Sequence, residues 1–388
     1  MSKAKKLIAF LKRETVLSIA LLLAVFSSFF VPPDERYMEY IDFRTLAILF
    51  CLMAVMAGLR NIGLFERIAR GLLGKMKSVL GLILILTMFC FFFSMLITND
   101  VALITFVPFT FTVLAMLGEE IKKKLVLTVV AMQTIGANLG SMLTPIGNPQ
   151  NLYLFGKSGM TMGEFTLLML PYTLFSLVLL LGWGVISGMR FRKTKCQEAT
   201  RLDKDTEPEH PMEAPRRGLL IAYLLLFVCC LLSVAHWLPW QAALAIVFLA
   251  VLLLDRSVLK QVDYALLFTF AGFFVFIGNM GRIPLFSDFL RGIILGREVY
   301  TSVIASQVLS NVPAALLLSG FTKDYESLII GTNLGGLGTL IASMASLISY
   351  KYIIKEEESS KGAYIGIFTI ANLLFLAALL LLYRFCTG

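Results

Sequence analysis

Residues 136–151 form a helix-breaking stretch inside an otherwise apolar part of the chain. This stretch, GANLGSMLTPIGNPQN, has glycine and proline at Gly136, Gly140, Pro145, Gly147 and Pro149. Proline removes a backbone donor and clashes with the preceding turn, and glycine weakens a helix, so one continuous helix is excluded. At membrane depth, non-helical backbone is tolerated only where it is buried in protein or lines a cavity. The stretch therefore predicts a broken membrane helix and a candidate binding site.

The same pattern returns in the second half of the chain. Residues 331–347 align with the first stretch without gaps, at an offset of 195 residues. Identical pairs include Asn138 and Asn333, Gly140 and Gly335, and Thr144 and Thr339. Interrupted helices at corresponding places in two halves are the best sequence indication of a transporter's binding site.

The composition places the chain in a membrane. Of its 388 residues, 58% are hydrophobic and 15% are charged, whereas soluble domains are about 45–50% apolar and about 25% charged. The net charge of +9 lies mostly in loops, so it indicates orientation and predicts no nucleic-acid partner. Basic residues precede the first apolar run, which predicts a multi-pass protein of the cell membrane with a cytoplasmic N-terminus.

Apolar runs and charged loops predict the order of the elements. We expect spans at about 14–31, 43–59, 164–189 and 218–235, an interfacial amphipathic helix at 62–75, broken spans at about 125–155 and 328–352, and a last span ending outside at Arg384. Val79–Leu117 is apolar on both sides of Thr98-Asn99-Asp100, which predicts a re-entrant hairpin. Two full crossings would give the same charge pattern. The tip of a second hairpin is expected at Ser310-Asn311-Val312-Pro313.

A second alignment predicts that the two repeats are inverted. Residues 41–71 match residues 262–292 at an offset of 221, and counting spans places Asp42 outside and Asp263 inside. We interpret both acids as helix N-caps. The same count places Arg282 outside, against the positive-inside trend. The expected fold is an all-α polytopic membrane protein with two inverted repeats, each with a re-entrant hairpin and a broken transmembrane helix. Its parts are residues 1–189 (first repeat), 190–217 (cytoplasmic linker) and 218–388 (linking helix and second repeat).

The hairpin tips and broken helices resemble the ion transporter superfamily. That group includes the divalent anion/sodium symporters, the citrate permeases, the arsenical pump membrane proteins and one class of sodium/proton antiporters, and the similarity runs from about Asp42 to Tyr350. The symporters have Ser-Asn-Thr at both tips, whereas this chain has Thr98-Asn99-Asp100 and Ser310-Asn311-Val312. Its Gly-Asn-Pro-Gln-Asn run at 147–151 is similar to their Gly-Thr-Pro-Pro-Asn. The Asn-Asp tip is more similar to the arsenical-pump and antiporter branch.

These residues predict an anion site made of neutral donors. Asn and Thr side chains donate hydrogen bonds, and the N-termini of half-helices add partial positive charge. We expect the substrate to contact Thr98, Asn99, Asn151, Ser310, Asn311, Thr144 and Thr339. In the alternative interpretation, these side chains only satisfy the broken backbone or join helices.

Ion coupling is predicted beside the same tips. The candidate residues are Asp100, Asn138, Gly140, Asn333 and Gly335, with Asn99, Asp100 and Asn311 as ligands of bound sodium. No other cofactor is expected. An intramembrane acid is costly and is a functional hypothesis by default, and Asp100 is the only acid that we expect deep in the membrane. The competing interpretation of Asp100 is a structural helix cap.

Together, these features predict a secondary active transporter in the lipid bilayer. We expect it to move a small anion, either a di- or tricarboxylate or an inorganic oxyanion, coupled to sodium or protons. A sodium/proton antiporter and an arsenite efflux permease are the alternatives. An enzyme is not expected, because the two histidines, His210 and His236, lie in or near loops and assemble no acid–base or metal cluster. The resemblance further implies a homodimer.

Overall fold

The computed structural model describes residues 14–73, 78–189 and 217–387, and helices dominate these ranges. The basic N-terminal segment and residues 190–216 of the expected linker lie outside the described residues. Within the described part, five helices are long and apolar enough to cross a membrane. They are α4 (Phe43–Asn61), α10 (Met162–Met189), α11 (Arg217–Val234), α13 (Tyr264–Gly281) and α19 (Lys361–Thr387). The predicted all-α polytopic class is therefore confirmed.

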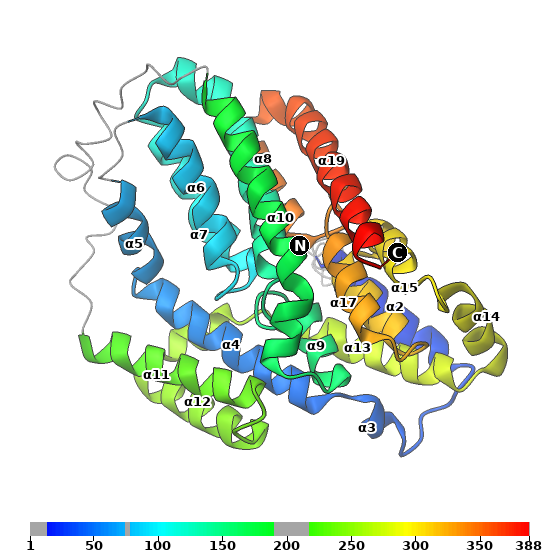
Figure 1. The fold of residues 1–388 in the computed structure, drawn as a ribbon. Coiled ribbons are helices and arrows are strands. Elements are labelled where there is room, and N and C mark those ends of the chain that lie inside the picture. Colours follow the sequence, from blue (N-terminus) through cyan, green and yellow to red (C-terminus); the bar gives the residue numbers. More distant parts are fainter. Residues whose placement is uncertain (1–13, 74–77, 190–216, 388) are drawn as a thin grey trace, which may run out of the picture.

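The helices form two groups (Figure 1). In the lower group, α13 packs on α2 (Thr15–Ser28), while α11 and α12 (Trp240–Leu254) pack on α4. The other group, which we call the upper group, contains both hairpins, both broken helices, α10 and α19; α6, α8 and α19 lie in the upper part of the view, and α9 lies lower, level with α13. The groups meet where α4 packs on α9 (Pro149–Ser158) and α13 packs on α16 (Asn311–Ser319). The bounds of α12 were not predicted from the sequence.

The first repeat contains a hairpin followed by a broken helix, as predicted. Helices α6 (Val79–Phe93) and α7 (Asn99–Ala115) are joined by residues 94–98, and α8 (Glu119–Ser141) is separated from α9 by residues 142–148. Helix α6 has 15 residues, or about 22 Å at 1.5 Å per residue, which is less than the ~30 Å hydrocarbon core. This geometry favours a re-entrant hairpin over two full crossings.

The second repeat has the same succession of elements. Helix α15 (Glu298–Leu309) turns at Ser310 (φ 77°) into α16, and α17 (Tyr325–Leu334) is separated by residues 335–343 from α18 (Met344–Glu356). The short helices α5 (Leu64–Leu73) and α14 (Pro284–Ile294) also correspond. The two repeats pack against each other: α9 of the first repeat packs on α16 and α17 of the second, and α18 of the second packs on α7 and α8 of the first. Their inverted relation stays a prediction.

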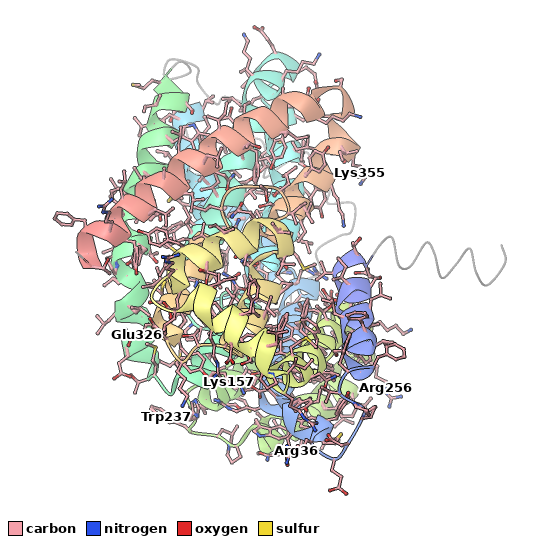
Figure 2. The ribbon with its side chains drawn as sticks, turned by 90° about the vertical axis from the view of Figure 1, so that its right-hand side faces the viewer. Arg36, Lys157, Trp237, Arg256, Glu326 and Lys355 are labelled. Carbon is pink, nitrogen blue, oxygen red and sulfur yellow. The ribbon has the colours of Figure 1, made fainter. Side chains whose placement is uncertain are left out.

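Polar contacts join helix ends that were predicted to lie on the same side of the membrane. Lys122 Nζ lies 2.9 Å from Glu357 Oε1, and Arg60 Nη2 donates to Gln261 Oε1 at 3.0 Å. Figure 2 shows Lys355, close to Glu357 in sequence, near one end of the molecule and Trp237 toward the other. These contacts agree with the predicted sides, and the absolute orientation stays a prediction.

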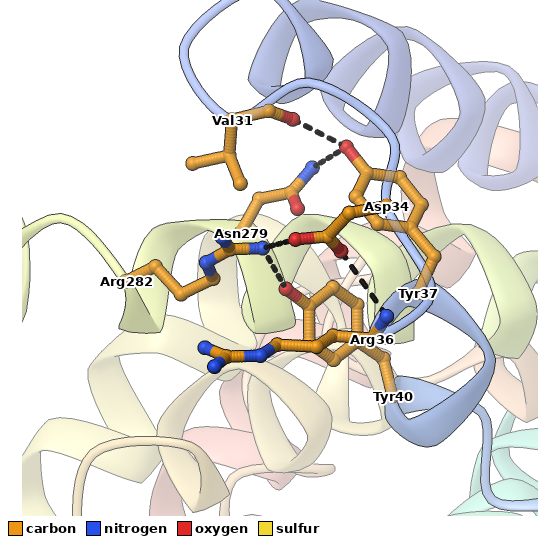
Figure 3. A network of polar contacts seen from close by, with 7 residues as sticks. All are labelled: Val31, Asp34, Arg36, Tyr37, Tyr40, Asn279 and Arg282. Carbon is orange, nitrogen blue, oxygen red and sulfur yellow. Dashed lines mark hydrogen bonds and ion pairs between the residues drawn. The ribbon is translucent and has the colours of Figure 1, made fainter.

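A polar network fastens the segment after α2 to the end of α13 (Figure 3). Arg282 Nη1 donates to Asp34 Oδ2 at 2.7 Å and to the Tyr40 hydroxyl at 3.1 Å. Asn279 Nδ2 donates to the Tyr37 hydroxyl at 2.8 Å, and that hydroxyl donates to Val31 O. Arg282, which the span count placed outside against the positive-inside trend, therefore has an acidic partner from the same predicted side.

Asp42 and Asp263 are N-caps, as predicted. Asp42 Oδ1 accepts from the Thr45 N–H at 3.0 Å, and Asp263 Oδ1 accepts from the Leu266 N–H at 2.9 Å. Each carboxylate thereby satisfies a backbone donor in the first turn of its helix. These caps fix the beginning of α4 and α13, which pack on α9 and α16 of the upper group.

Candidate functional site

The N-termini of α7, α9, α16 and α18 meet at a small cavity, which we call the inner compartment. Its lining residues include Asn99, Asp100, Asn148, Pro149, Gln150, Asn311, Val312, Ser343 and Met344, and Leu266 of α13 adds an apolar wall. Its volume is about 10 Å³, and one water needs about 10–15 Å³ of such space. Because helix N-termini carry partial positive charge, the compartment is suited to a small electronegative group.

A larger cavity adjoins it, which we call the outer compartment. It measures about 130 Å³ and shares Asp100, Asn148 and Pro149 with the inner compartment. Thr98 and apolar side chains of α4 line its walls, and the more exposed Arg60 and Asp263 lie at its edge. The two compartments together reach from the hairpin tips to the side that was predicted to be cytoplasmic.

Main-chain hydrogen bonds attach each hairpin tip to the neighbouring break. The Asn99 N–H donates to Gly147 O at 3.1 Å, and the Asn311 N–H donates to Ala342 O at 2.9 Å. Each asparagine Oδ1 also accepts from the next backbone N–H, at 2.9 Å for Asn99 and 3.0 Å for Asn311. Each tip is thus bonded to its own break, and both tips line the inner compartment, so they lie close together, as predicted.

Three buried asparagines of the expected site join the repeats to each other. Asn138 Oδ1 accepts from Asn99 Nδ2 and from Ser343 Oγ, both at 3.0 Å. Asn333 Nδ2 donates to Asn151 Oδ1 at 2.7 Å. Asn138, Asn151 and Asn333 lie behind the compartments and line neither of them. These contacts are structural, and the predicted roles of the three residues in substrate binding and ion coupling stay predictions.

The two threonines of the expected site also contact the hairpins. Thr144 Oγ1 donates to Met95 O at 2.6 Å, and Thr339 Oγ1 donates to Gln307 O at 3.2 Å. Thr144 thereby attaches its break to the turn directly after the first arm of its hairpin, and Thr339 attaches its break to the end of the first arm. Ser310 is nearby, and its hydroxyl donates to Ala342 O at 3.4 Å. Their predicted contact with substrate stays a prediction.

Gly140 and Gly335 allow each broken helix to approach its hairpin closely. A Cβ atom at Gly140 would collide with Phe91 O and Ser94 Oγ, and one at Gly335 would collide with Ser306. The two glycines are therefore required by packing. Neither glycine is a lining residue of either compartment, and their predicted participation in ion coupling stays a prediction.

Asp100 lines both compartments. Its Oδ1 is buried and has no hydrogen-bond partner among the described residues. Thr98, not Asp100, occupies the N-cap position of α7. The position therefore favours a role toward a ligand over the capping alternative, since a buried acceptor without a partner is costly.

Several polar residues of these cavities were missed by the sequence analysis, among them Asn148, Gln150 and Arg60. Gln150 lines the inner compartment and Arg60 lines the outer one. Gln150 was overlooked because the alignment emphasised identical pairs, and its counterpart at the offset of 195 is Ala345. A polar residue directly after the Pro that begins α9 was the available signal. Arg60 was interpreted only as a charge that indicates orientation.

Comparison with known proteins identifies the family of the chain. Residues 6–324 match the citrate transporter family. The chain belongs to the citrate transporter family. This finding also confirms the superfamily resemblance, because citrate permeases are among the members of that superfamily.

Several relatives of this citrate transporter family member are transporters by name. An uncharacterized transporter of Methanocaldococcus jannaschii is 32% identical over 372 residues, covering 93% of this chain and 95% of the relative. Inner membrane protein YbiR of Escherichia coli is 28% identical over 349 residues, 88% of each chain. The silicon efflux transporter LSI3 of rice is 32% identical over 152 residues, covering 39% of this chain and 30% of the relative. The chain is therefore a multi-pass membrane transporter.

Proposed function

We propose that this member of the citrate transporter family is a secondary active transporter of a small anion, either a di- or tricarboxylate or an inorganic oxyanion, coupled to sodium or protons. The observation that carries the proposal is the meeting of four helix N-termini, among the described residues, at the inner compartment. Their partial positive charges favour an anion without a buried cationic side chain.

Asp100 supports the coupling. An anion beside this carboxylate is repelled, and the repulsion is strong in a cavity of low dielectric. A sodium ion or a proton at Asp100 removes that repulsion, so cation and anion favour each other's binding. In this proposal Asn99 and Asn311 complete the sodium site, because each carbonyl oxygen that accepts one backbone N–H has a second lone pair.

Arg60 supports an access path through the outer compartment. Its guanidinium is held by Gln261 at 3.0 Å and lines the cavity that continues to Asp100. A cation at this position raises the local concentration of anions. We expect substrate to enter or leave from this side.

A sodium/proton antiporter is the second candidate function. The unpaired oxygen of Asp100 favours it, because one carboxylate that exchanges the two cations needs no anion. Efflux of arsenite or another oxyacid uses the same architecture, and the partial similarity to a silicon efflux transporter supports this version.

Transport by purified protein in proteoliposomes tests the proposal. Uptake of labelled citrate or phosphate is measured with an imposed inward sodium or proton gradient, and with the gradient collapsed by an ionophore. We expect gradient-dependent accumulation of one of these anions. Sodium-driven proton flux without any anion would instead establish the antiporter, and absence of both would refute coupled transport.

A further inference from the structure

Gln150 is a buried side chain that the proposed site has not used. It lies at the second position of α9, its exposed fraction is 0%, and it lines the inner compartment. Within the described part of the chain, neither its Nε2 nor its Oε1 has a hydrogen-bond partner. Buried polar groups are almost always paired, and each exception needs an explanation. An amide that lacks both partners beside a cavity indicates a ligand.

Two other glutamines donate hydrogen bonds to protein atoms through Nε2, although Gln133 Oε1, like Gln150 Oε1, has no partner among the described residues. Gln307 Nε2 donates to Gly335 O at 3.0 Å and Leu337 O at 2.9 Å, and its Oε1 accepts from the Thr339 N–H at 2.9 Å. Gln133, also 0% exposed, donates to Leu86 O at 3.1 Å and to Thr110 Oγ1 at 2.8 Å. These two side chains join helices. Neither amide atom of Gln150 has a partner among the described residues, so the structural explanation does not extend to it.

The unpaired atoms around the inner compartment define what a ligand must offer. Nε2 of Gln150 is a donor and needs an acceptor, whereas Oε1 of Gln150 and Oδ1 of Asp100 are acceptors and need a donor. A fully ionised carboxylate or sulfate oxygen only accepts. A hydroxyl group both donates and accepts, and it is about the size of the inner compartment.

We propose that Gln150 contacts the transported anion directly and selects an anion that carries a hydroxyl group. The hydroxyl enters the inner compartment, accepts from Gln150 Nε2 and donates to Gln150 Oε1 or Asp100 Oδ1. The rest of the anion occupies the outer compartment. Hydroxycarboxylates and partly protonated oxyanions share this chemistry. This inference rests on the proposed anion transport and adds the feature by which the anion is chosen.

Matched pairs of anions test the selection in the wild-type protein. The pairs are citrate and tricarballylate, malate and succinate, and phosphate and sulfate, and the second member of each pair lacks the hydroxyl. Ligand-dependent thermal stabilisation of the full chain in detergent gives the affinities. In the pair that matches the substrate class, we expect the hydroxyl-bearing member to bind about tenfold tighter or more, because its absence leaves buried polar groups unpaired.

Gln150→Leu removes both amide atoms at similar volume, and Gln133→Leu is the matched control. We expect Gln150→Leu to lose the preference within the pair while its melting temperature without ligand is equal to or above that of the wild type, since an unpaired polar group has been removed. Gln133→Leu should lower the melting temperature and keep the preference.

Three results would overturn the inference. They are equal wild-type affinity for both members of every pair, an unchanged preference in Gln150→Leu, and a loss of unliganded stability in Gln150→Leu as large as in Gln133→Leu. If both members of a pair bind equally well and only in the presence of sodium, Gln150 Oε1 and Asp100 Oδ1 bind the coupling cation instead of a hydroxyl. The proposed anion transport would not be contradicted by that result. Failure of all six anions to stabilise the wild type would refute the proposed anion transport itself, and the selection with it.

Discussion

The first and second repeats share a main-chain arrangement but differ in the side chains that face the ligand cavities. In both, an asparagine N–H at the hairpin tip donates to a carbonyl in the break, and a threonine hydroxyl donates to a carbonyl at the end of the first arm or in the turn directly after it. The first repeat adds Asp100 and Gln150 to the cavity, where the second has Val312 and Ala345. The acid and amide atoms of the inner compartment that lack a hydrogen-bond partner among the described residues therefore belong to the first repeat, while the second repeat contributes the hydrogen-bonded Asn311.

The reverse difference occurs behind the tips. Gln307 of the second repeat satisfies the carbonyls of its own break with its amide, while the first repeat has Met95 at the corresponding contact with threonine. In the second repeat, the polar side chain of Gln307 therefore binds the backbone of its own break and not a ligand. We infer that duplication supplied a symmetric frame and that binding chemistry is concentrated in the first repeat.

The largest expected effect comes from exchanging the acid of the first tip. Asp100→Asn removes the charge at similar shape, and we expect coupled transport to fall about tenfold or more, since hydrogen bonds to charged groups are the stronger ones. Val312→Ala, its counterpart in the second repeat, should leave coupling intact. Transport by both variants is measured across external pH and sodium concentration.

The profile of Asp100→Asn also separates the candidate functions. Symport predicts weaker sodium dependence with anion affinity kept at saturating sodium, and antiport predicts loss of all exchange. Because Asn caps a helix nearly as well as Asp, an unaltered profile would restore the capping interpretation and remove Asp100 from the mechanism.

The two tip asparagines give the next effect. Asn99→Ala and Asn311→Ala should each abolish ligand-dependent thermal stabilisation, since a donor missing from a dehydrated site costs about 1–3 kcal/mol. Asn99 also donates to Asn138, so we expect the larger loss of unliganded stability in Asn99→Ala. Melting curves with and without ligand measure both quantities. If both variants transport normally, the tips are not the binding site.

A purely structural effect is expected at Gln307. Gln307→Met introduces the residue type that the first repeat has at the corresponding position, Met95. The substitution leaves the carbonyls of Gly335 and Leu337 without their side-chain donor. We expect the free energy of unfolding to drop by about 1–3 kcal/mol, with the preference among anions unchanged. Met95→Leu is the control and should cost less than about 1.5 kcal/mol. A changed preference in Gln307→Met would contradict the division between the repeats.

The smallest effect concerns an ion pair that joins the repeats at their predicted cytoplasmic ends. The hydrogen bond to Glu357 raises the pKa of Lys122, and the nearby Glu119 carboxylate adds to it. A raised pKa means that this contribution is fully present below the unfolded-state pKa, about 10.4, and is lost as pH rises through the folded-state value. Lys122→Gln should therefore cost about 0–1 kcal/mol at neutral pH. The difference in melting temperature between Lys122→Gln and the wild type should vanish at pH values above the folded-state pKa of Lys122. A difference that persists at such pH values would argue against the ion pair.

The sequence predicted the helix breaks and helix caps better than it predicted which side chains line the two compartments. Breaks at 142–148 and 335–343 follow from glycine and proline in apolar surroundings, since such residues force the same local result in any tertiary context. The caps Asp42 and Asp263 were predicted for the same local reason. Whether Asn138 faces a ligand or another asparagine depends on which helix lies opposite, and sequence spacing carries no such information. Gln150 stands out only once its surroundings show that nothing in the described chain pairs with it.

The attachment of each tip through main-chain atoms has a consequence for how transporters of this kind diversify. The bonds from the Asn99 and Asn311 N–H groups to Gly147 O and Ala342 O survive almost any substitution, because every residue except proline has an amide hydrogen. Cavity-facing side chains can therefore be exchanged by mutation without dismantling the junction that presents them. A new substrate specificity can therefore evolve by single substitutions while the backbone arrangement at the tips is kept.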